Sequence, residues 1–340
     1  MKALVFHGAH ELRLEELPMP LPAADEALVK VKAVGICGSD IHGYAGKTGR
    51  RAPGMVMGHE FCGVVEKAAW NSSRFKAGQP VVIQPILFCG KCPICRKGLT
   101  SICPNKRFIG VDMGTVGGLA EYIAVPERNL FPLPIDLPFE LGAITEAFAV
   151  GSGAARNSEI KAGDTVAIVG CGVIGLTILL MTKAYFPAKI FIIDNNPERL
   201  KIAAELGAEP VNFSKEKPED VISSATGGLG TDISIEAVGC SPSVATAIKV
   251  VRNGGRIVWV GNSQKIIDVD MQDIVVHGKH IVGMYCYNDD DFGMAMEFIS
   301  CNPEIAARFA EEKVSMADAP EMFRQLASGS KQPLRTVVII

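Results

Sequence analysis

Three residues of the types that bind zinc stand early in the chain, namely Cys37, His59 and Glu60. A thiolate, an imidazole and a carboxylate leave one position of a four-coordinate zinc open, which is typical of a catalytic rather than a structural site. Cys37 and His59 lie far apart in sequence, so folding must bring the ligands together. Without further context, the same residues would also suit a buried cysteine and an ordinary polar turn.

A second set of ligands is compact in sequence. Cys89, Cys92, Cys95 and Cys103 follow the pattern C-x2-C-x2-C-x7-C, and four crowded thiolates repel one another unless a cation lies among them. A closed tetrahedral zinc is the simplest solution. The main alternative is an iron–sulfur cluster, but in ferredoxin motifs the fourth cysteine follows after three residues and precedes proline. Here it follows after seven, although Pro104 comes next, so we favour zinc.

A glycine-rich turn predicts a dinucleotide site. The β-branched run 165–169 is typical of a buried parallel strand, and it leads into Gly170-Cys171-Gly172-Val173-Ile174-Gly175 and then an apolar stretch to about residue 186. Gly170 would allow the tight turn, Gly172 the approach of a pyrophosphate, and Gly175 close packing of helix on strand. The N-terminus of the helix would favour the phosphate charge.

The next strand, 189–193, ends at an acid, Asp194. We expect this carboxylate to bind the ribose hydroxyls of NAD and to repel the 2′-phosphate of NADP. Arg199, one helical turn further on, is the one nearby cation that could reach a phosphate. The expected cofactor contacts are Gly170, Gly172, Val173, Ile174, Gly175, Asp194, Arg199, Val238 and Gly261.

The chain changes character near residue 150. Before it, short alternating strands suggest a small β-barrel or sandwich; we expect them at 2–6, 27–34, 61–67 and 80–85. After it, strands alternate with helices, which implies a doubly wound parallel sheet; we expect these strands at 165–169, 189–193, 232–239, 256–261 and 281–285. The tail from Asp291 has a helical pattern and ends in a strand at 336–340.

Composition excludes several classes of protein. The 340 residues include 34 basic and 37 acidic ones, for a net charge of −3, and no basic block suggests nucleic-acid binding. The longest apolar run, 173–181, is too short to span a bilayer, and the N-terminus lacks a signal-peptide pattern. Ten cysteines in such a chain indicate metal ligands and free thiols, so we expect a cytoplasmic protein.

Taken together, these features resemble the zinc-dependent medium-chain dehydrogenase/reductase family, most closely its sorbitol, butanediol and threonine dehydrogenase branch. The resemblance spans nearly the whole chain and is carried by residues 37–42, 58–60, the four-cysteine loop, Glu146 and residues 170–194. It implies an α/β plus β fold in three parts: a GroES-like β-barrel catalytic domain at 1–150, a Rossmann NAD-binding domain at 151–290, and a C-terminal return to the catalytic domain at 291–340.

The resemblance also implies roles for individual residues. Cys37, His59 and a carboxylate would hold the catalytic zinc, and relatives differ over whether the acid matching Glu60 or the one matching Glu146 is the ligand. A lone carboxylate such as Glu146 would otherwise be expected at a surface.

Three further side chains would support catalysis. Asp40 resembles the acid that orients a zinc-bound histidine, and Ser39 and His42 resemble a relay that carries the proton of the alcohol away. The implied chemistry is hydride transfer from a secondary alcohol (a diol, polyol or related hydroxy compound) to NAD. The implied enzyme is a homodimer or homotetramer with two zinc ions per chain, acting on a small molecule without nucleic-acid or membrane partners.

Three positions depart from the family pattern. Ala147 stands where many relatives have proline, Gly153 where many have histidine, and Cys286 where sorbitol dehydrogenases have arginine. The last departure disfavours sorbitol itself and leaves the substrate open, with Tyr44 and Tyr287 as candidate pocket residues. A zinc-free enone reductase and a non-catalytic NAD-binding sensor are the two alternatives; the open ligand set and the relay argue against both.

Overall fold

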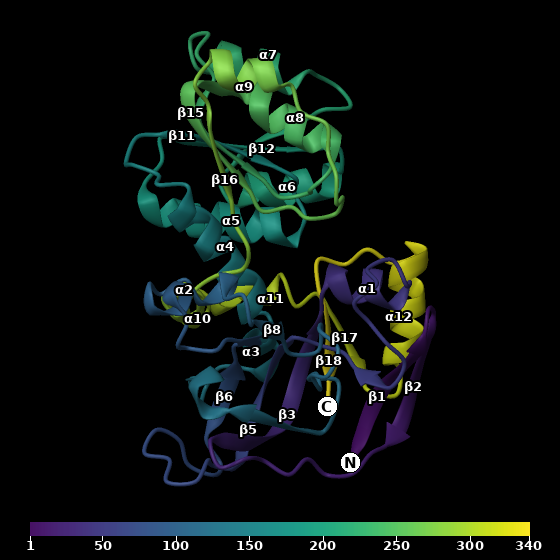
Figure 1. The fold of residues 1–340 in the computed structure, drawn as a ribbon. Coiled ribbons are helices and arrows are strands. Elements are labelled where there is room, and N and C mark those ends of the chain that lie inside the picture. The colour runs from purple at the N-terminus through teal and green to yellow at the C-terminus, as the bar shows by residue number, and fades with distance from the viewer. The chain divides into compact units, whose positions relative to one another are not determined.

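The computed structural model describes residues 1–340 and divides them into two units (Figure 1). Unit 1 comprises Met1–Glu146 and Phe292–Ile340, and unit 2 comprises Ala147–Asp291. The boundaries expected from sequence lay after residues 150 and 290. No helix is both long and apolar enough to cross a membrane.

Unit 1 is mainly β-structure. Its strands are β1 (Lys2–Gly8), β2 (Glu11–Glu16), β3 (Glu26–Ile36), β4 (Met55–Val56), β5 (Glu60–Lys67), β6 (Pro80–Ile83), β7 (Ile86–Leu87), β8 (Arg107–Phe108), β9 (Tyr122–Pro126), β10 (Leu130–Pro132), β17 (Glu312–Ser315) and β18 (Thr336–Ile339). The largest sheet has seven strands in the order β10-β6-β5-β3-β18-β17, with β9 also paired to β3. Two smaller sheets have the orders β2-β1-β4 and β7-β8.

Unit 1 also contains five helices and two 3-10 turns. They are α1 (Gly38–Tyr44), α2 (Pro93–Arg96), α3 (Phe139–Ala143), α11 (Pro303–Ala307) and α12 (Ala319–Ser328), with 3-10 turns η1 (Thr100–Ile102) and η2 (Glu127–Asn129). Two longer helices cross the unit boundaries along the chain: α4 (Thr145–Asn157) and α10 (Asp289–Cys301).

Alternation along β3 explains how the core of unit 1 forms. Ala27, Val29, Val31 and Ala33 are buried at every second position, because successive side chains of a strand point to opposite faces. The last strand of the chain, β18, pairs antiparallel with β3, with Val338 opposite Val34. This pairing carries the residue that precedes β18, Arg335, to the end of β3 beside Cys37.

Several strands of unit 1 were not expected from sequence, including the short strands β4, β7 and β10. β2 was not predicted, and β17 lies in a tail that we expected to be helical before its final strand. The sequence of β17, Glu-Lys-Val-Ser, has a single apolar residue and lies at the edge of its sheet. The pairing of β17 with β18 determines that it is a strand, whereas its own sequence pattern does not predict one.

Unit 2 has the expected doubly wound architecture (Figure 1). Its strands are β11 (Thr165–Val169), β12 (Lys189–Asp194), β13 (Glu209–Asn212), β14 (Thr231–Glu236), β15 (Val251–Trp259) and β16 (His280–Gly283). All pairings are parallel, in the order β13-β12-β11-β14-β15-β16. The order reverses between β11 and β14, and in such sheets ligands bind at that point, beyond the carboxyl ends of the strands.

Helices cover both faces of this sheet. They are α5 (Val173–Thr182), α6 (Pro197–Glu205), α7 (Pro218–Ala225), α8 (Ser241–Val250) and α9 (Met271–Val276), with a 3-10 turn η3 (Lys183–Tyr185). Figure 1 shows α7, α8 and α9 on one face and α5 and α6 on the other. We did not expect β13, whose short sequence contains Pro210 and lies at the sheet edge, where proline is tolerated.

Candidate metal centres and dinucleotide site

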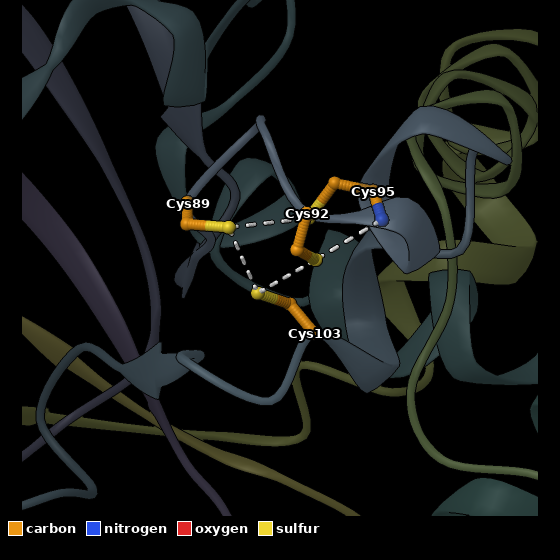
Figure 2. A group of neighbouring side chains, drawn as sticks. All are labelled: Cys89, Cys92, Cys95 and Cys103. Atoms are coloured by element: carbon orange, nitrogen blue, oxygen red, sulfur yellow. Dashed lines mark hydrogen bonds between the residues drawn. The ribbon is translucent and has the colours of Figure 1, made fainter.

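The four cysteines of the compact ligand set, here called the four-cysteine cluster, come together in one lobe (Figure 2). The Sγ atom of Cys89 lies 3.9 Å from that of Cys95 and 3.6 Å from that of Cys103, and the Sγ atoms of Cys92 and Cys103 lie 4.0 Å apart. A tetrahedral zinc with Zn–S bonds of about 2.3 Å holds its sulfurs about 3.8 Å apart. The cluster therefore fits one zinc ion, whereas the several irons of an iron–sulfur cluster would spread the thiolates further.

Backbone groups position these thiols, and apolar packing contributes little. Cys92 precedes α2, and its Sγ accepts a hydrogen bond from the N–H of Cys95 at 3.4 Å. The backbone N–H groups of Lys91 and Cys92 lower the pKa of Cys89 to about 6, which favours the thiolate form that binds metal. Leu99 and Ile102 are 45% and 46% exposed, and the third large apolar residue of the lobe, Ile94, is half-buried.

The second metal group, here called the Cys37 cluster, consists of Cys37, His59 and Glu60. Strand pairing explains how residues distant in sequence meet: Gly35 of β3 is paired with Glu60 of β5, so Cys37 just after β3 faces the residues just before β5. The candidate ligand atoms of all three side chains lie within 4.8 Å of one another. One thiolate, one imidazole and one carboxylate at this spacing fit a zinc with an open fourth position.

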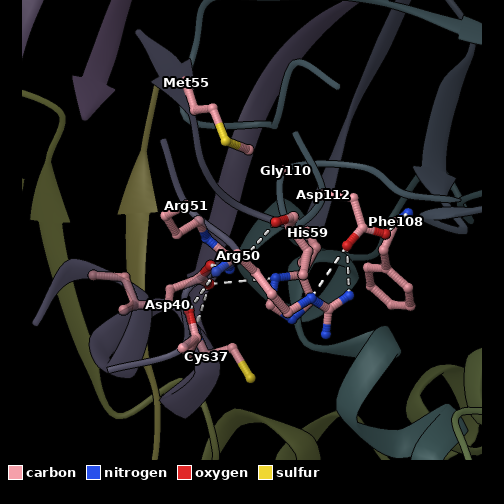
Figure 3. A network of polar contacts seen from close by, with 12 residues as sticks. Cys37, Asp40, Arg50, Arg51, Met55, His59, Phe108, Gly110 and Asp112 are labelled. Atoms are coloured by element: carbon pink, nitrogen blue, oxygen red, sulfur yellow. Dashed lines mark hydrogen bonds and ion pairs between the residues drawn. The ribbon is translucent and has the colours of Figure 1, made fainter. Parts of the chain in front are cut away.

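Asp40 connects two members of the Cys37 cluster (Figure 3). Its Oδ2 atom accepts a hydrogen bond from the backbone N–H of Cys37 at 3.2 Å and lies 3.4 Å from Nδ1 of His59. With Nδ1 directed at a carboxylate, the other ring nitrogen of His59 is the one available to a metal. The ring of Phe108 packs edge-on against His59, with ring centroids 5.5 Å apart.

Glu60 is fully buried and is held by Arg335. The guanidinium Nη2 lies 3.0 Å from Oε1 of Glu60, and Nη1 donates to the carbonyl of Ile36 at 3.1 Å. The position opposite Glu60 must be glycine, since a Cβ on Gly35 would lie 2.4 Å from Oε2 of Glu60. Gly35 thus leaves space for the carboxylate of Glu60, and the buried guanidinium of Arg335 offsets its negative charge.

The shifted pKa values of the Cys37 cluster indicate that positive charge placed among these buried groups would be stabilised. Burial raises the pKa of Cys37, but His59 and Arg335 lower it more, to about 6. Burial lowers the pKa of His59, but Asp40 and Cys37 raise it well above its ordinary value. Burial raises the pKa of Glu60 to about 8 despite the opposing effect of Arg335. A metal cation bound by these groups would supply positive charge at this place.

The remaining expected site residues of unit 1 occupy varied positions. Glu146 is buried, 6% exposed, rather than at a surface; its charge acts on Arg335, although its carboxylate is not among the groups of the Cys37 cluster. Ser39 and His42 are exposed on α1. Tyr44 is not a pocket residue, because it belongs to the core, where its hydroxyl donates to the carbonyl of His10 and its ring packs on Phe323.

The glycine turn of unit 2 has distinct local requirements at each glycine. Gly170 has φ +103°, and a Cβ on Gly175 would lie 1.8 Å from the carbonyl oxygen of Gly170. Gly172 immediately precedes α5, and a Cβ there would meet nothing closer than Nη1 of Arg199 at 4.0 Å. The space over Gly172 is therefore open at the N-terminus of a helix, where Val173 and Ile174 form the first turn and phosphate charge is favoured.

Asp194 fastens the glycine turn to the next strand. Its Oδ2 atom accepts from the backbone N–H of Cys171 at 2.7 Å, and Oδ1 accepts from those of Asn195 and Asn196 at 2.7 and 2.9 Å. The carboxylate is thus held at the carboxyl end of β12. Arg199 follows on α6.

Two loops from neighbouring strands complete this edge of the sheet. β14 ends at Glu236, earlier than expected, because Oε1 of Glu236 accepts from the backbone N–H groups of Val238 and Gly239 and turns the chain. A Cβ on Gly261 would lie 2.1 Å from the nitrogen of Gly239, and a Cβ on Gly170 would lie 2.6 Å from Cγ2 of Val238. The turn after β11 and the loops after β14 and β15 are therefore in direct contact.

Sequence reasoning missed three buried charged residues of these sites: Arg51, Arg335 and Glu236. Arg51 stands in a polar loop beside Arg50, and Arg335 stands one residue before the last strand. Charged residues in such places are usually solvated, so only tertiary structure reveals them. Glu236 gave a weak signal, as an acid at the end of a buried strand.

Comparison with family models gives two matches. Residues 23–135 match the alcohol dehydrogenase GroES-like domain. Residues 173–301 match the zinc-binding dehydrogenase domain.

Individual relatives match along most of the chain. Sorbitol dehydrogenase of Bacillus subtilis is 30% identical over 343 residues, covering 99% of this chain and 97% of that protein. L-threonine 3-dehydrogenase of Bacillus velezensis is 35% identical over 292 residues, covering 84% and 83%. The crystal structure of 2R,3R-butanediol dehydrogenase from Bacillus subtilis superposes with a TM-score of 0.87 at 31% identity, covering 100% and 99%.

Proposed function

Because the chain belongs to the zinc-dependent medium-chain dehydrogenase/reductase family, we propose that it oxidises a secondary alcohol with NAD as the hydride acceptor. The observation that carries this proposal is the Cys37 cluster, in which three ligand groups converge and leave one position for a substrate. A zinc-free enone reductase would have no use for these ligands, and a non-catalytic sensor would have no use for an open position.

We assign two zinc ions to each chain. Cys89, Cys92, Cys95 and Cys103 would hold the first in a closed site. Cys37, His59 and a carboxylate would hold the second, and Glu60 is the carboxylate that the geometry favours over Glu146. When bound there, zinc supplies Lewis acidity that lowers the pKa of an alcohol hydroxyl.

The residues of the chain would prepare and complete the proton transfer. Asp40 fixes the ring of His59 by its position at Nδ1. Ser39 would accept the proton of the alcohol while donating its own hydroxyl proton to His42, and His42 would pass a proton to solvent, since both side chains are exposed on α1. NAD, when bound, would supply the acceptor for the hydride of the alcohol.

Asp194 supports NAD rather than NADP as cofactor. Its carboxylate is fixed at the end of β12 by three backbone N–H groups, and a fixed negative charge repels a 2′-phosphate. Asn195 and Asn196, which follow it, add no cation; Arg199 is the one basic side chain of the first helical turn.

The substrate would carry a polar group next to the reacting hydroxyl. The names of the relatives include a polyol, a diol and a β-hydroxy amino acid dehydrogenase, and these substrates share that feature. Cys286, where sorbitol dehydrogenases have arginine, favours a diol over a long polyol.

We further propose a cytoplasmic homodimer or homotetramer. No disulfide joins any of the ten cysteines, as suits a reducing compartment. Unit 2 exposes a run of large apolar side chains at and before α9: Ile266, Val269, Met271, Val275 and Val276. Such a patch next to the edge strand β16 suits a subunit interface.

A substrate panel tests the proposed reaction. Purified protein with NAD is offered diols, polyols, β-hydroxy amino acids and primary alcohols, and NADH absorbance is recorded. We expect turnover with at least one vicinal diol or related secondary alcohol. Turnover only with primary alcohols or formaldehyde, or reduction of enones with NADPH, would refute it.

A further inference from the structure

Arg51 is a buried cation behind the Cys37 cluster (Figure 3). Its side chain is 2% exposed, and its two terminal nitrogens serve different partners. Nη2 donates to Oδ1 of Asp40 at 3.0 Å, and Nη1 donates to the backbone carbonyl of Val111 at 2.7 Å. A guanidinium with two fixed acceptors holds both in one plane, which a lysine could not do.

One partner of Arg51, Asp40, contacts His59, and the other, Val111, belongs to a loop that contacts it. Asp40 presents its second oxygen to Nδ1 of the ring and to the backbone N–H of Cys37. Val111 belongs to the loop that carries Phe108, whose ring packs edge-on against His59. Arg51 therefore fixes the two neighbours that fix the ring.

The structure makes room for this arginine. A Cβ on Gly43 of α1 would lie 2.8 Å from Cγ and 3.1 Å from Nε of Arg51, so the glycine lets the side chain pass beneath the helix. Gly43 lies one turn after Asp40 on the same helix, which places the stem of the arginine and the carboxylate on one face.

We propose that Arg51 is a positioning residue of the catalytic metal centre: through Asp40 it sets the orientation of His59 and Cys37 and so the affinity and ligand geometry of the zinc. The inference rests on the proposed function, because it assumes that the Cys37 cluster holds a metal. Arg51 acts through other residues and does not contact the reacting atoms.

The neighbouring residue supplies a matched control. Arg50 has the same charge and stands in the same loop, but it is exposed and pairs with Asp112. Arg50→Met therefore removes one positive charge and the ion pair with Asp112, which contains two hydrogen bonds, and leaves the hydrogen bond from Arg51 to Asp40 in place. Arg51→Met and Arg51→Lys both remove the guanidinium group that binds Asp40 and Val111 together. Only Arg51→Lys keeps the positive charge.

The experiment compares zinc release and the cobalt(II) spectrum. We expect Arg51→Met to lose its catalytic zinc to a chelator about 10- to 100-fold more readily, as is typical when a supporting partner of a metal ligand is removed. We also expect a shifted absorption spectrum of the cobalt-substituted protein. Arg51→Lys should fall between it and the wild type, and Arg50→Met should match the wild type.

A double-mutant cycle tests the route through Asp40. If Arg51 acts through this carboxylate, Arg51→Met should change zinc release far less in an Asp40→Asn background. An equal effect in both backgrounds, or a wild-type spectrum and zinc affinity with only a lower Tm for Arg51→Met, would overturn the inference. A wild type that holds no zinc at the Cys37 cluster would overturn the proposed function as well, so the two failures are distinguishable.

Discussion

The two metal clusters of unit 1 use similar ligands in opposite surroundings. The four-cysteine cluster comes from one segment, 89–103, in which two of the three large apolar side chains, Leu99 and Ile102, are about half exposed. The Cys37 cluster comes from residues flanking two central strands of the seven-stranded sheet, β3 and β5, and its carboxylate is fully buried.

The supporting charges differ in the same way. Asp40, Arg51 and Arg335 surround the Cys37 cluster and are each at most 5% exposed in their side chains. The four-cysteine cluster relies on its own backbone N–H groups. A site with this little packing depends on its metal for local folding. A site built into a core keeps its fold without the metal, so its metal is available for catalysis.

The largest effect should come from Cys37→Ser. Loss of this ligand should lower kcat at least about 1000-fold, since Lewis-acid stabilisation is worth several kcal/mol and about 1.4 kcal/mol corresponds to a factor of ten. The protein should keep its Tm and bind NADH, because the cores of both units do not depend on the thiolate. Activity assays, thermal melting and NADH fluorescence check this, and an unfolded variant would contradict it.

Cys95→Ser should reverse that pattern. Breaking the closed site should lower Tm by about 5 °C or more, equivalent to about 2 kcal/mol in a protein of this size, or disturb assembly. Activity should decline only as far as folding declines. Calorimetry and size-exclusion chromatography provide the measurement; a normal melt with lost activity would show that the two sites are assigned the wrong way round.

Glu60→Gln and Glu146→Gln form a matched pair that separates the two candidate carboxylate ligands. The substitution keeps size and an acceptor for Arg335 while removing the charge. We expect Glu60→Gln to lose catalytic zinc about 10- to 100-fold more readily than Glu146→Gln does. The reason is that Glu60, and not Glu146, has its carboxylate within ligand distance of Cys37 and His59. Zinc content after dialysis shows which carboxylate is the ligand. Greater loss of zinc from Glu146→Gln would mean that Glu146 is the ligand.

Asp194→Ser lies outside both clusters and should leave both metals in place. The ratio of kcat/KM for NAD to that for NADP should fall about 10- to 100-fold, the value of about one hydrogen bond to a charged group. Asp194→Asn keeps one acceptor for the turn and controls for loosening of the loop. Equal kcat/KM for the two cofactors in the wild type would refute the NAD preference.

The sequence revealed the elements whose signals are local and missed those that depend on tertiary contacts. The run 165–169 and the glycine turn predicted β11, α5 and their order correctly. Both signals, the β-branched composition and the glycine spacing, lie within the local sequence and need no knowledge of distant contacts. β13 and β17 could not be recognised, since their pairing at sheet edges determines them.

The candidate sites show the same division. Cysteine spacing predicted a closed group that the structure brings together. The burial of Glu146 on α4 and the roles of the loop residues Arg51 and Arg335 could not be foreseen, because the surroundings of all three are set by residues distant in sequence. Tyr44 was misjudged for a related reason, as its ring faces α12 rather than a pocket.

Chelation of the wild-type protein tests the central claim most directly. Zinc content, activity and Tm are followed together as a chelator is added. The account predicts two zinc ions per chain at the start, complete loss of activity as the first ion leaves, and a fall in Tm only as the second leaves. A single zinc, an iron content, or activity that survives until Tm falls would contradict it.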